Sequence, residues 1–222
     1  MSAAWSDLRV RVLSAIAMIG VGLGALYAGP DPFLLLIGIV LAVGVFELIS
    51  MGRKKSATGV FSFADFFGLS LYAFMICLGA LGLVALRFRY GEGGVLAVVA
   101  LVVVTDTMGY FVGRLVGGPK FWPSISPKKT WSGILGGWLG AAILGAIVFT
   151  TEAFTGPLVL AVLGAASLSF LSQMGDIIES ALKRRMGVKD SSNLIPGHGG
   201  VLDRFDALLA VSAVLMPFVL FG

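Results

Sequence analysis

The sequence is poor in charged residues, cysteine and histidine. Of its 222 residues 13% are charged and 58% are hydrophobic, whereas an average soluble protein has about 25% charged residues. This composition argues against a soluble domain and is typical of an integral membrane protein. The single cysteine, Cys77, lies in an apolar run, so it cannot form an intramolecular disulfide, and it argues against a metal site built on thiolates.

The basic excess, a formal net charge of +4, does not indicate nucleic-acid binding in so apolar a chain. Lys and Arg belong instead in the loops between membrane helices, where they set the topology. No internal repeat or low-complexity segment is present. We therefore predict one membrane domain over residues 1–222, in which residues 1–100 are generic membrane helices and residues 100–222 carry the polar motifs.

Seven hydrophobic runs come close to the length of about 20 apolar residues that a membrane helix needs. They fall at residues 12–28, 33–49, 67–86, 94–113, 133–150, 156–175 and 207–220. The connections GPDP and TEAFT, after the first and fifth runs, are so short that they predict antiparallel helix hairpins. The predicted fold is all-α and polytopic, with about seven transmembrane helices.

The distribution of Lys and Arg predicts the orientation of these helices. Of the 16 basic residues, only Arg87 and Arg89 fall on the side opposite the N-terminus. Because basic loops stay on the cytoplasmic side, the N-terminus and the two long polar loops are predicted in the cytoplasm, and the C-terminus outside. The first run also has the form of a signal peptide, but its cleavage would leave the downstream topology unchanged.

Carboxylates interrupt or flank the late runs. Asp106 lies inside the fourth run, Asp176 and Glu179 follow the sixth, and Asp203 and Asp206 precede the seventh. A charge in or near a bilayer costs several kcal/mol unless it faces a partner, an ion or water. We therefore expect these carboxylates to gather at the cytoplasmic face, together with the basic residues of the long loops.

A site of this composition suits phosphoryl-type transfer. The carboxylates of Asp176, Asp203 and Asp206 are hard oxygen ligands for Mg²⁺, which proteins hold with few carboxylates plus substrate phosphates. Lys and Arg bind phosphate, and the candidates are Lys128, Lys129, Lys183, Arg184, Lys189 and Arg204. The alternative, that basic residues merely flank membrane helices, is favoured for residues 53–55. It is not favoured for Lys183 and Arg184, because acidic and basic residues alternate there at helical spacing, and Asp176, Ser180 and Lys183 share one helix face.

The stretch SNLIPGHGGVLDRFD, residues 192–206, predicts a loop that binds anions and leads into a helix. Its glycines, Gly199 and Gly200 among them, let the backbone approach a ligand and expose N–H groups to an anion. Asp203 begins the helix, whose N-terminal dipole favours phosphate. His198, the only histidine, is interpreted as a phosphate or loop contact or as a structural residue, rather than as a metal ligand.

Two segments resemble the hallmarks of the phosphatidate cytidylyltransferases, also called CDP-diacylglycerol synthases. SALKRRMGVKDSSNLIPGHGGVLDRFD, residues 180–206, is similar to the family signature throughout. DTMGYFVGRLVGGPKFWPSISPKKTWSG, residues 106–133, is similar to the second hallmark. One residue departs from the pattern, because Ser132 follows Trp131 where the family usually has Glu.

The resemblance implies a Mg²⁺-dependent nucleotidyltransferase of phospholipid biosynthesis in the bacterial cytoplasmic (inner) membrane, with its active site facing the cytoplasm. Such a transferase converts CTP and phosphatidate to CDP-diacylglycerol and pyrophosphate. Carried over to this chain, the resemblance makes Asp176 and Asp203 metal ligands, with Asp206 nearby. It assigns Lys183 and Arg184 to catalysis, and it assigns the binding of substrate phosphates to Ser126, Lys128, Lys129, Lys189, His198, Gly199, Gly200 and Arg204.

Two other functions are compatible with polar residues at a membrane face. A polyprenol or phytol kinase would use similar helices and charges but would transfer the γ-phosphate of its nucleotide. A lipid transporter would carry paired internal repeats and broken helices, which the sequence does not show. The sequence leaves open whether a monovalent cation accompanies Mg²⁺ and whether the chain forms a homodimer.

Overall fold

The computed structural model describes residues 3–151 and 156–221. In these ranges six helices are present: α1 Ala3–Ala28, α2 Pro30–Thr58, α3 Phe63–Leu115, α4 Trp131–Thr150, α5 Leu158–Arg185 and α6 Leu202–Phe221. Two short antiparallel strands, β1 Lys120–Trp122 and β2 Ser126–Thr130, form a hairpin before α4. All six helices are long and apolar enough to cross a membrane. The structure thus confirms the predicted all-α membrane fold.

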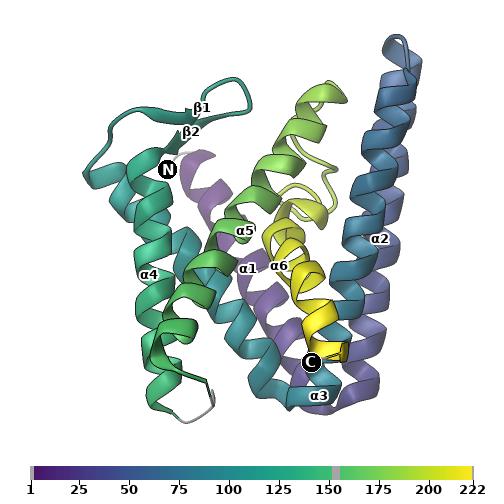
Figure 1. Ribbon diagram of the computed structural model, residues 1–222. Coiled ribbons are helices and arrows are strands. Elements are labelled where there is room, and N and C mark those ends of the chain that lie inside the picture. The colour runs from purple at the N-terminus through teal and green to yellow at the C-terminus, as the bar shows by residue number, and fades with distance from the viewer. Residues whose placement is uncertain (1–2, 152–155, 222) are drawn as a thin grey trace.

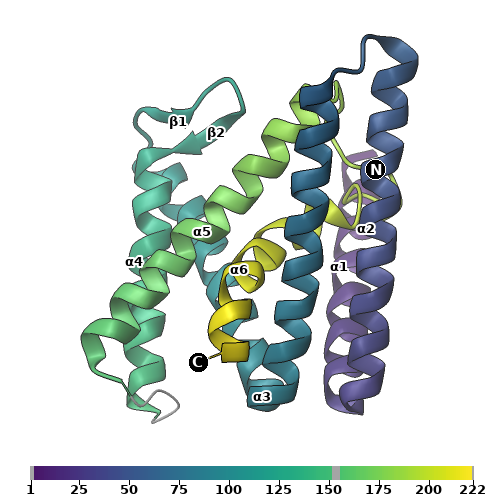
Figure 2. The same cartoon turned by 45° about the vertical axis from the view of Figure 1, so that its right-hand side comes forward.

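Helix α3 contains two of the predicted runs, 67–86 and 94–113, and it is broken at Gly91. Gly91 has φ 65° and ψ −155°, a backbone conformation that favours glycine. Figures 1 and 2 show α3 passing down beside α2, turning at the lower end of the view and rising again toward the hairpin. The Arg87 guanidinium, 2.5 Å from Glu92 Oε1, holds the two sides of the break together.

The connection GPDP forms the predicted helix hairpin. Only Gly29 separates α1 from α2, with φ 131°. Pro30 begins α2, a position at which its missing N–H and fixed φ are well tolerated. The second predicted hairpin connection, TEAFT, includes residues 152–155, which lie outside the described residues.

Helices α3 and α6 approach each other closely through glycine. A Cβ atom at Gly79 would lie 2.3 Å from the carbonyl oxygen of Leu209, and one at Gly82 would lie 2.1 Å from that of Ser212. Small residues commonly allow this approach between membrane helices. The resulting backbone contact fixes α6, which carries two of the candidate carboxylates, against α3.

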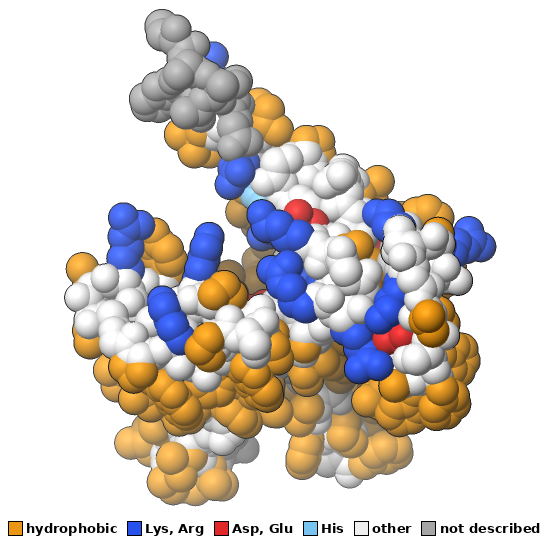
Figure 3. Space-filling model, turned by 90° about the horizontal axis from the view of Figure 1, so that it is seen from above, with side chains coloured by type: hydrophobic (Ala, Val, Ile, Leu, Met, Phe, Trp, Pro, Cys, Tyr) orange, Lys and Arg blue, Asp and Glu red, His pale blue; other side chains and the backbone are white. Residues whose placement is uncertain are grey.

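The polar segments gather at one end of the bundle, which we call the polar end. The hairpin, the connection between α2 and α3, and the loop between α5 and α6 lie there, at the top of Figure 1. Figure 3 views this end and shows Lys and Arg side chains on its surface, with hydrophobic side chains on the flanks. Buried Asp65 joins three helix ends, because it pairs with Lys55 Nζ at 3.0 Å and with Arg185 Nε at 2.6 Å.

Candidate active site

Three carboxylates converge where α5 packs against α6. Asp176 and Glu179 lie one turn apart on α5, and Asp206 lies on α6. One potential ligand atom from each lies within 4.8 Å of the other two. Glu179 is 0% exposed, whereas the Asp176 side chain is 36% exposed. We call these three residues the carboxylate cluster.

Asp203 lies beside the carboxylate cluster rather than within it. Its Oδ1 forms an ion pair with Lys183, whose Nζ also donates to Glu179 Oε2 at 2.9 Å. Its Oδ2 accepts hydrogen bonds from the backbone N and the Oγ of Ser191, each at 2.9 Å, and from the backbone N of Gly200 at 2.8 Å. Lys183 therefore links the carboxylate cluster to Asp203, and Asp203 links the start of α6 to the preceding loop.

Lys129 connects the hairpin to the carboxylate cluster. Its Nζ lies 2.5 Å from Asp176 Oδ2. Strand β2 leads directly into α4 through Thr130, whose side chain caps that helix by accepting from Gly133 N at 3.2 Å. The start of α4 therefore fixes the place of Lys129. Two segments far apart in the sequence meet at this ion pair.

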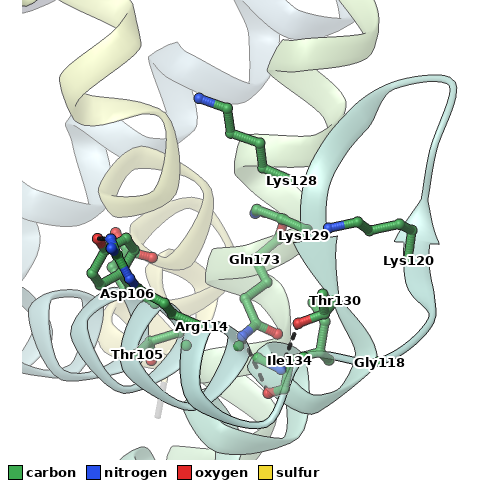
Figure 4. Close-up of a pocket in the computed structure, with 15 residues that line it drawn as sticks. Thr105, Asp106, Arg114, Gly118, Lys120, Lys128, Lys129, Thr130, Ile134 and Gln173 are labelled. Atoms are coloured by element: carbon green, nitrogen blue, oxygen red, sulfur yellow. Dashed lines mark hydrogen bonds between the residues drawn. The ribbon is translucent and has the colours of Figure 1, made fainter.

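A cavity of about 720 Å³ opens between α3, α4, α5 and the hairpin. Figure 4 shows the side chains of Lys120 and Lys129 extending from the hairpin toward the other lining residues, whereas that of Lys128 extends above them. The charged residues of the lining are Asp106, Arg114, Lys120, Lys128 and Lys129. Four cationic side chains and one carboxylate in the lining suit a polyanionic ligand such as a nucleoside triphosphate. Because Lys129 both lines the cavity and pairs with Asp176, the cavity adjoins the carboxylate cluster.

Hydrogen bonds fix several polar groups of the cavity wall. Arg114 donates to Tyr110 Oη at 2.6 Å, and its guanidinium lies 5.9 Å from the centre of that ring. Gln173 accepts from Trp138 Nε1 at 3.0 Å and donates to the Ile134 carbonyl oxygen at 3.3 Å. The wall is therefore organised before any ligand binds, which lowers the cost of ordering it.

Four other residues were predicted to bind substrate: His198, Gly199 and Gly200 lie in the turn before α6, and Arg204 lies in the first turn of α6. Gly199 has φ 86°, and its carbonyl oxygen accepts from Ile195 N at 2.8 Å. Arg204 donates through Nε and a terminal nitrogen to the His198 carbonyl oxygen, at 3.0 and 2.7 Å. These contacts hold the turn against α6, and none of the four residues lines the cavity.

Three predicted residues occupy more peripheral positions. Ser126 lies at the start of β2, Arg184 near the end of α5, and Lys189 in the loop that follows. Arg184 and Lys189 are exposed, and none of the three lines the cavity. Of the hairpin residues predicted to bind substrate, Lys128 and Lys129 are the ones that reach it.

Sequence reasoning did not assign a site role to Glu179, Arg114 or Lys120. For Glu179 a signal was available, because a residue three positions after Asp176 on a helix lies on nearly the same face. For Lys120 the signal is the pairing of β1 with β2, which places it opposite Thr130. No local pattern distinguishes Arg114 from the other basic residues that flank membrane helices.

The carboxylate cluster fits a divalent cation such as Mg²⁺. It offers three hard oxygen donors, the ligand type that Mg²⁺ prefers. Glu179 Oε1 is buried and has no hydrogen-bond partner among the described residues, and burying such an acceptor without a partner is costly. Two of the predicted ligands, Asp176 and Asp206, belong to this cluster, and the third, Asp203, adjoins it through Lys183.

Residues 58–221 match the sequence model of the cytidylyltransferase family. The chain belongs to this family. A phosphatidate cytidylyltransferase of Bacillus subtilis is 33% identical, in an alignment that covers 97% of this chain and 97% of the relative. One of Brucella abortus is 42% identical over 83% of this chain and 65% of the relative. One of Staphylococcus haemolyticus is 30% identical over 94% of this chain and 97% of the relative.

Ser132, which stands where the family usually has Glu, takes part in the structure of the hairpin. Its Oγ donates to the Gly117 carbonyl oxygen and lies 3.0 Å from Thr130 Oγ1. Ser132 thus ties the entry of the hairpin to the start of α4. The position has a structural role here that does not require a carboxylate.

Proposed function

We propose that this chain is a phosphatidate cytidylyltransferase, which makes CDP-diacylglycerol and pyrophosphate from CTP and phosphatidate. The observation that carries the proposal is the ion pair between Lys129 and Asp176, which joins a cationic cavity to the carboxylate cluster. A polyanionic nucleotide fits the cavity, and the cluster supplies oxygen ligands beside it. The polar end of a membrane bundle also suits a lipid whose head group reacts while its acyl chains stay in the bilayer.

The reaction forms one phosphorus–oxygen bond and breaks another. A phosphate oxygen of phosphatidate attacks the α-phosphorus of CTP in line, and the bond from that phosphorus to the oxygen bridging the β-phosphate breaks. Lys128 and Lys129 hold the triphosphate, with Arg114 and Lys120 on the same cavity wall. Lys183, between Glu179 and Asp203, keeps these carboxylates in place. The chain contributes mainly by positioning and by neutralising charge.

The proposed cofactor is Mg²⁺, held by Asp176, Glu179 and Asp206, with Asp203 adjoining. When bound, it would neutralise charge on the phosphate oxygens and stabilise the pyrophosphate leaving group. The donor set and the unpaired Glu179 Oε1 support this proposal.

We expect label from the α-position of CTP to enter lipid. Membranes containing the protein, supplied with phosphatidate and Mg²⁺, should yield a labelled chloroform-soluble product, and added pyrophosphate should suppress it by reversal. The reason is that phosphatidate already carries the nucleophilic phosphate, so the α-phosphorus stays with the lipid. Label that enters only from the γ-position, and only when an alcohol replaces phosphatidate, would instead establish a lipid kinase.

We also propose seven membrane crossings, in which α3 contributes one on each side of Gly91. The polar end would then face the cytoplasm and the C-terminus the outside of the cytoplasmic (inner) membrane. Two observations support this topology. Helix α1 begins at the polar end, whereas α6 ends at the opposite end (Figure 1). Lys and Arg gather at the polar end (Figure 3), as expected for the cytoplasmic side.

Reporter fusions test this orientation. A reporter active only in the cytoplasm should be active when inserted near Lys54 and silent when fused after Gly222, because an odd number of crossings separates the two positions from each other. A periplasmic reporter at the same positions should give the complementary result. Activity of the cytoplasmic reporter at both positions would require an even number of crossings between them and would overturn the topology.

A further inference from the structure

A buried carboxylate on α2 contacts the loop that precedes α6. Glu47 is 1% exposed. Its Oε1 accepts from Ser192 Oγ at 2.5 Å and from Val201 N at 2.9 Å, and its Oε2 accepts from Ser191 Oγ at 3.0 Å and from Leu202 N at 2.9 Å. All four donors are neutral and belong to this loop or to the first residue of α6. Four hydrogen bonds and the positive end of the α6 dipole thus stabilise a carboxylate that is removed from water.

Ser191 links Glu47 to Asp203. Its Oγ lies 3.0 Å from Glu47 Oε2 and 2.9 Å from Asp203 Oδ2. A serine hydroxyl has one hydrogen to donate, so the two carboxylates share a single donor. A displacement of Glu47 would therefore reach the Asp203 carboxylate through this shared hydroxyl. Ser192 also donates to Glu47, and its Oγ accepts from Leu194 N at 3.1 Å; within the described part of the chain it makes no hydrogen bond to Asp203.

Gly200 shows how tightly this arrangement is packed. A Cβ atom there would lie 1.9 Å from Ser191 Oγ and 2.5 Å from Glu47 Oε1. The backbone N–H of Gly200 already donates to Asp203 Oδ2 at 2.8 Å. The sequence predicted that Gly200 lets the backbone approach an anionic ligand. In the structure the anionic groups that it approaches are carboxylates of the protein itself.

We infer that Glu47 is a positioning residue, which holds Asp203 in place through Ser191 and fixes the start of α6 through Val201 and Leu202. The inference rests on the proposed function, since it gives Glu47 a part in the reaction in which Asp203 takes part. It extends the site to α2, in the half of the chain that the sequence described only as generic membrane helices.

The two serines provide a matched pair of variants. Ser191→Ala and Ser192→Ala each remove one hydroxyl donor from Glu47, but only Ser191→Ala removes a donor from Asp203. Ser191→Ala should lower kcat by about tenfold, whereas Ser192→Ala should lower it by less than about threefold, with KM for CTP changed by less than about threefold in both. Equal losses in the two variants would mean that Glu47 only stabilises the loop.

Glu47→Gln tests the carboxylate directly. Its amide nitrogen cannot accept from a backbone N–H, so hydrogen exchange of the Val201 and Leu202 amides should become faster. We expect kcat to fall by about tenfold, and we expect Asp203→Asn combined with Glu47→Gln to be less than about threefold slower than Asp203→Asn alone. Glu92→Gln, which changes a carboxylate at the opposite end of the bundle, is the control and should alter neither measurement.

The outcomes separate the inference from the proposed function. Wild-type protein that makes no labelled lipid would reject the proposed function, while the exchange measurement, made without substrate, would still report on the loop. If the wild-type protein is active, the double variant decides the inference. Losses of kcat that multiply when the Glu47 and Asp203 substitutions are combined would overturn it. Unchanged amide exchange in Glu47→Gln would overturn it as well.

Discussion

Asp176→Asn is expected to lower turnover by about 100-fold or more while leaving the protein folded in the membrane. Asp176 is the carboxylate of the cluster that meets the cavity, through its 2.5 Å ion pair with Lys129. Asn has nearly the same shape but lacks the negative charge that both Lys129 and a bound cation require. The measurement is the initial rate of labelled lipid formation from α-labelled CTP over a range of Mg²⁺ concentrations.

Glu92→Gln is the matched control for Asp176→Asn. It neutralises a carboxylate of a close ion pair, since Glu92 Oε1 lies 2.5 Å from Arg87, but this pair lies beside the break in α3, away from the polar end. Its rate should stay within about twofold of wild type, as for most substitutions outside a site. A near wild-type rate of Asp176→Asn at every Mg²⁺ concentration would remove Asp176 from the active site.

Lys129→Gln should lower kcat/KM for CTP by about 100-fold, divided between a higher KM and a lower kcat. The KM rises because the cavity loses a cation that would contact the triphosphate. The kcat falls because Asp176 loses the partner that holds it at the edge of the cavity. Steady-state rates over a range of CTP concentrations, at saturating phosphatidate and fixed ionic strength, separate these two effects.

Lys54→Gln makes the same change of charge at an exposed position near the end of α2. Its kcat/KM should stay within about twofold of wild type, because exposed charges beyond the site are screened by salt. Similar losses in Lys54→Gln and Lys129→Gln would show that CTP responds only to the general positive charge of this face. The specific role proposed for Lys129 would then be wrong.

Hydropathy located the helices because a membrane crossing demands a long apolar run. Hydropathy predicted less accurately the residues at which the helices end on the polar side. The sixth run was predicted to end at residue 175, yet α5 continues to Arg185, because polar turns stay helical where their charges are paired, as Lys183 is with Glu179. Hydropathy also could not show that Gly91 alone breaks α3, since Gly93 and Gly94 stand beside it and remain helical.

Residue types identified most of the charged groups of the site. They did not show which carboxylates form the carboxylate cluster and which one pairs with Lys183 outside it. Asp203 and Asp206 stand one turn apart at the start of the same helix, so the sequence gives both as metal ligands. Which of them meets Lys183 and which meets Glu179 depends on how α6 is rotated against α5, and tertiary packing sets that rotation. Glu47 carried only the weak signal of a single charge in an apolar run.

The contacts of Glu47 affect how much of the chain a functional fragment would need. The family match starts at residue 58, so a fragment cut at that boundary would retain every residue predicted for the site. It would nevertheless lack the carboxylate that accepts four hydrogen bonds from the loop before α6. The family match thus contains all the residues predicted for the chemistry, whereas the unit that we infer holds Asp203 and the start of α6 in place extends upstream into α2.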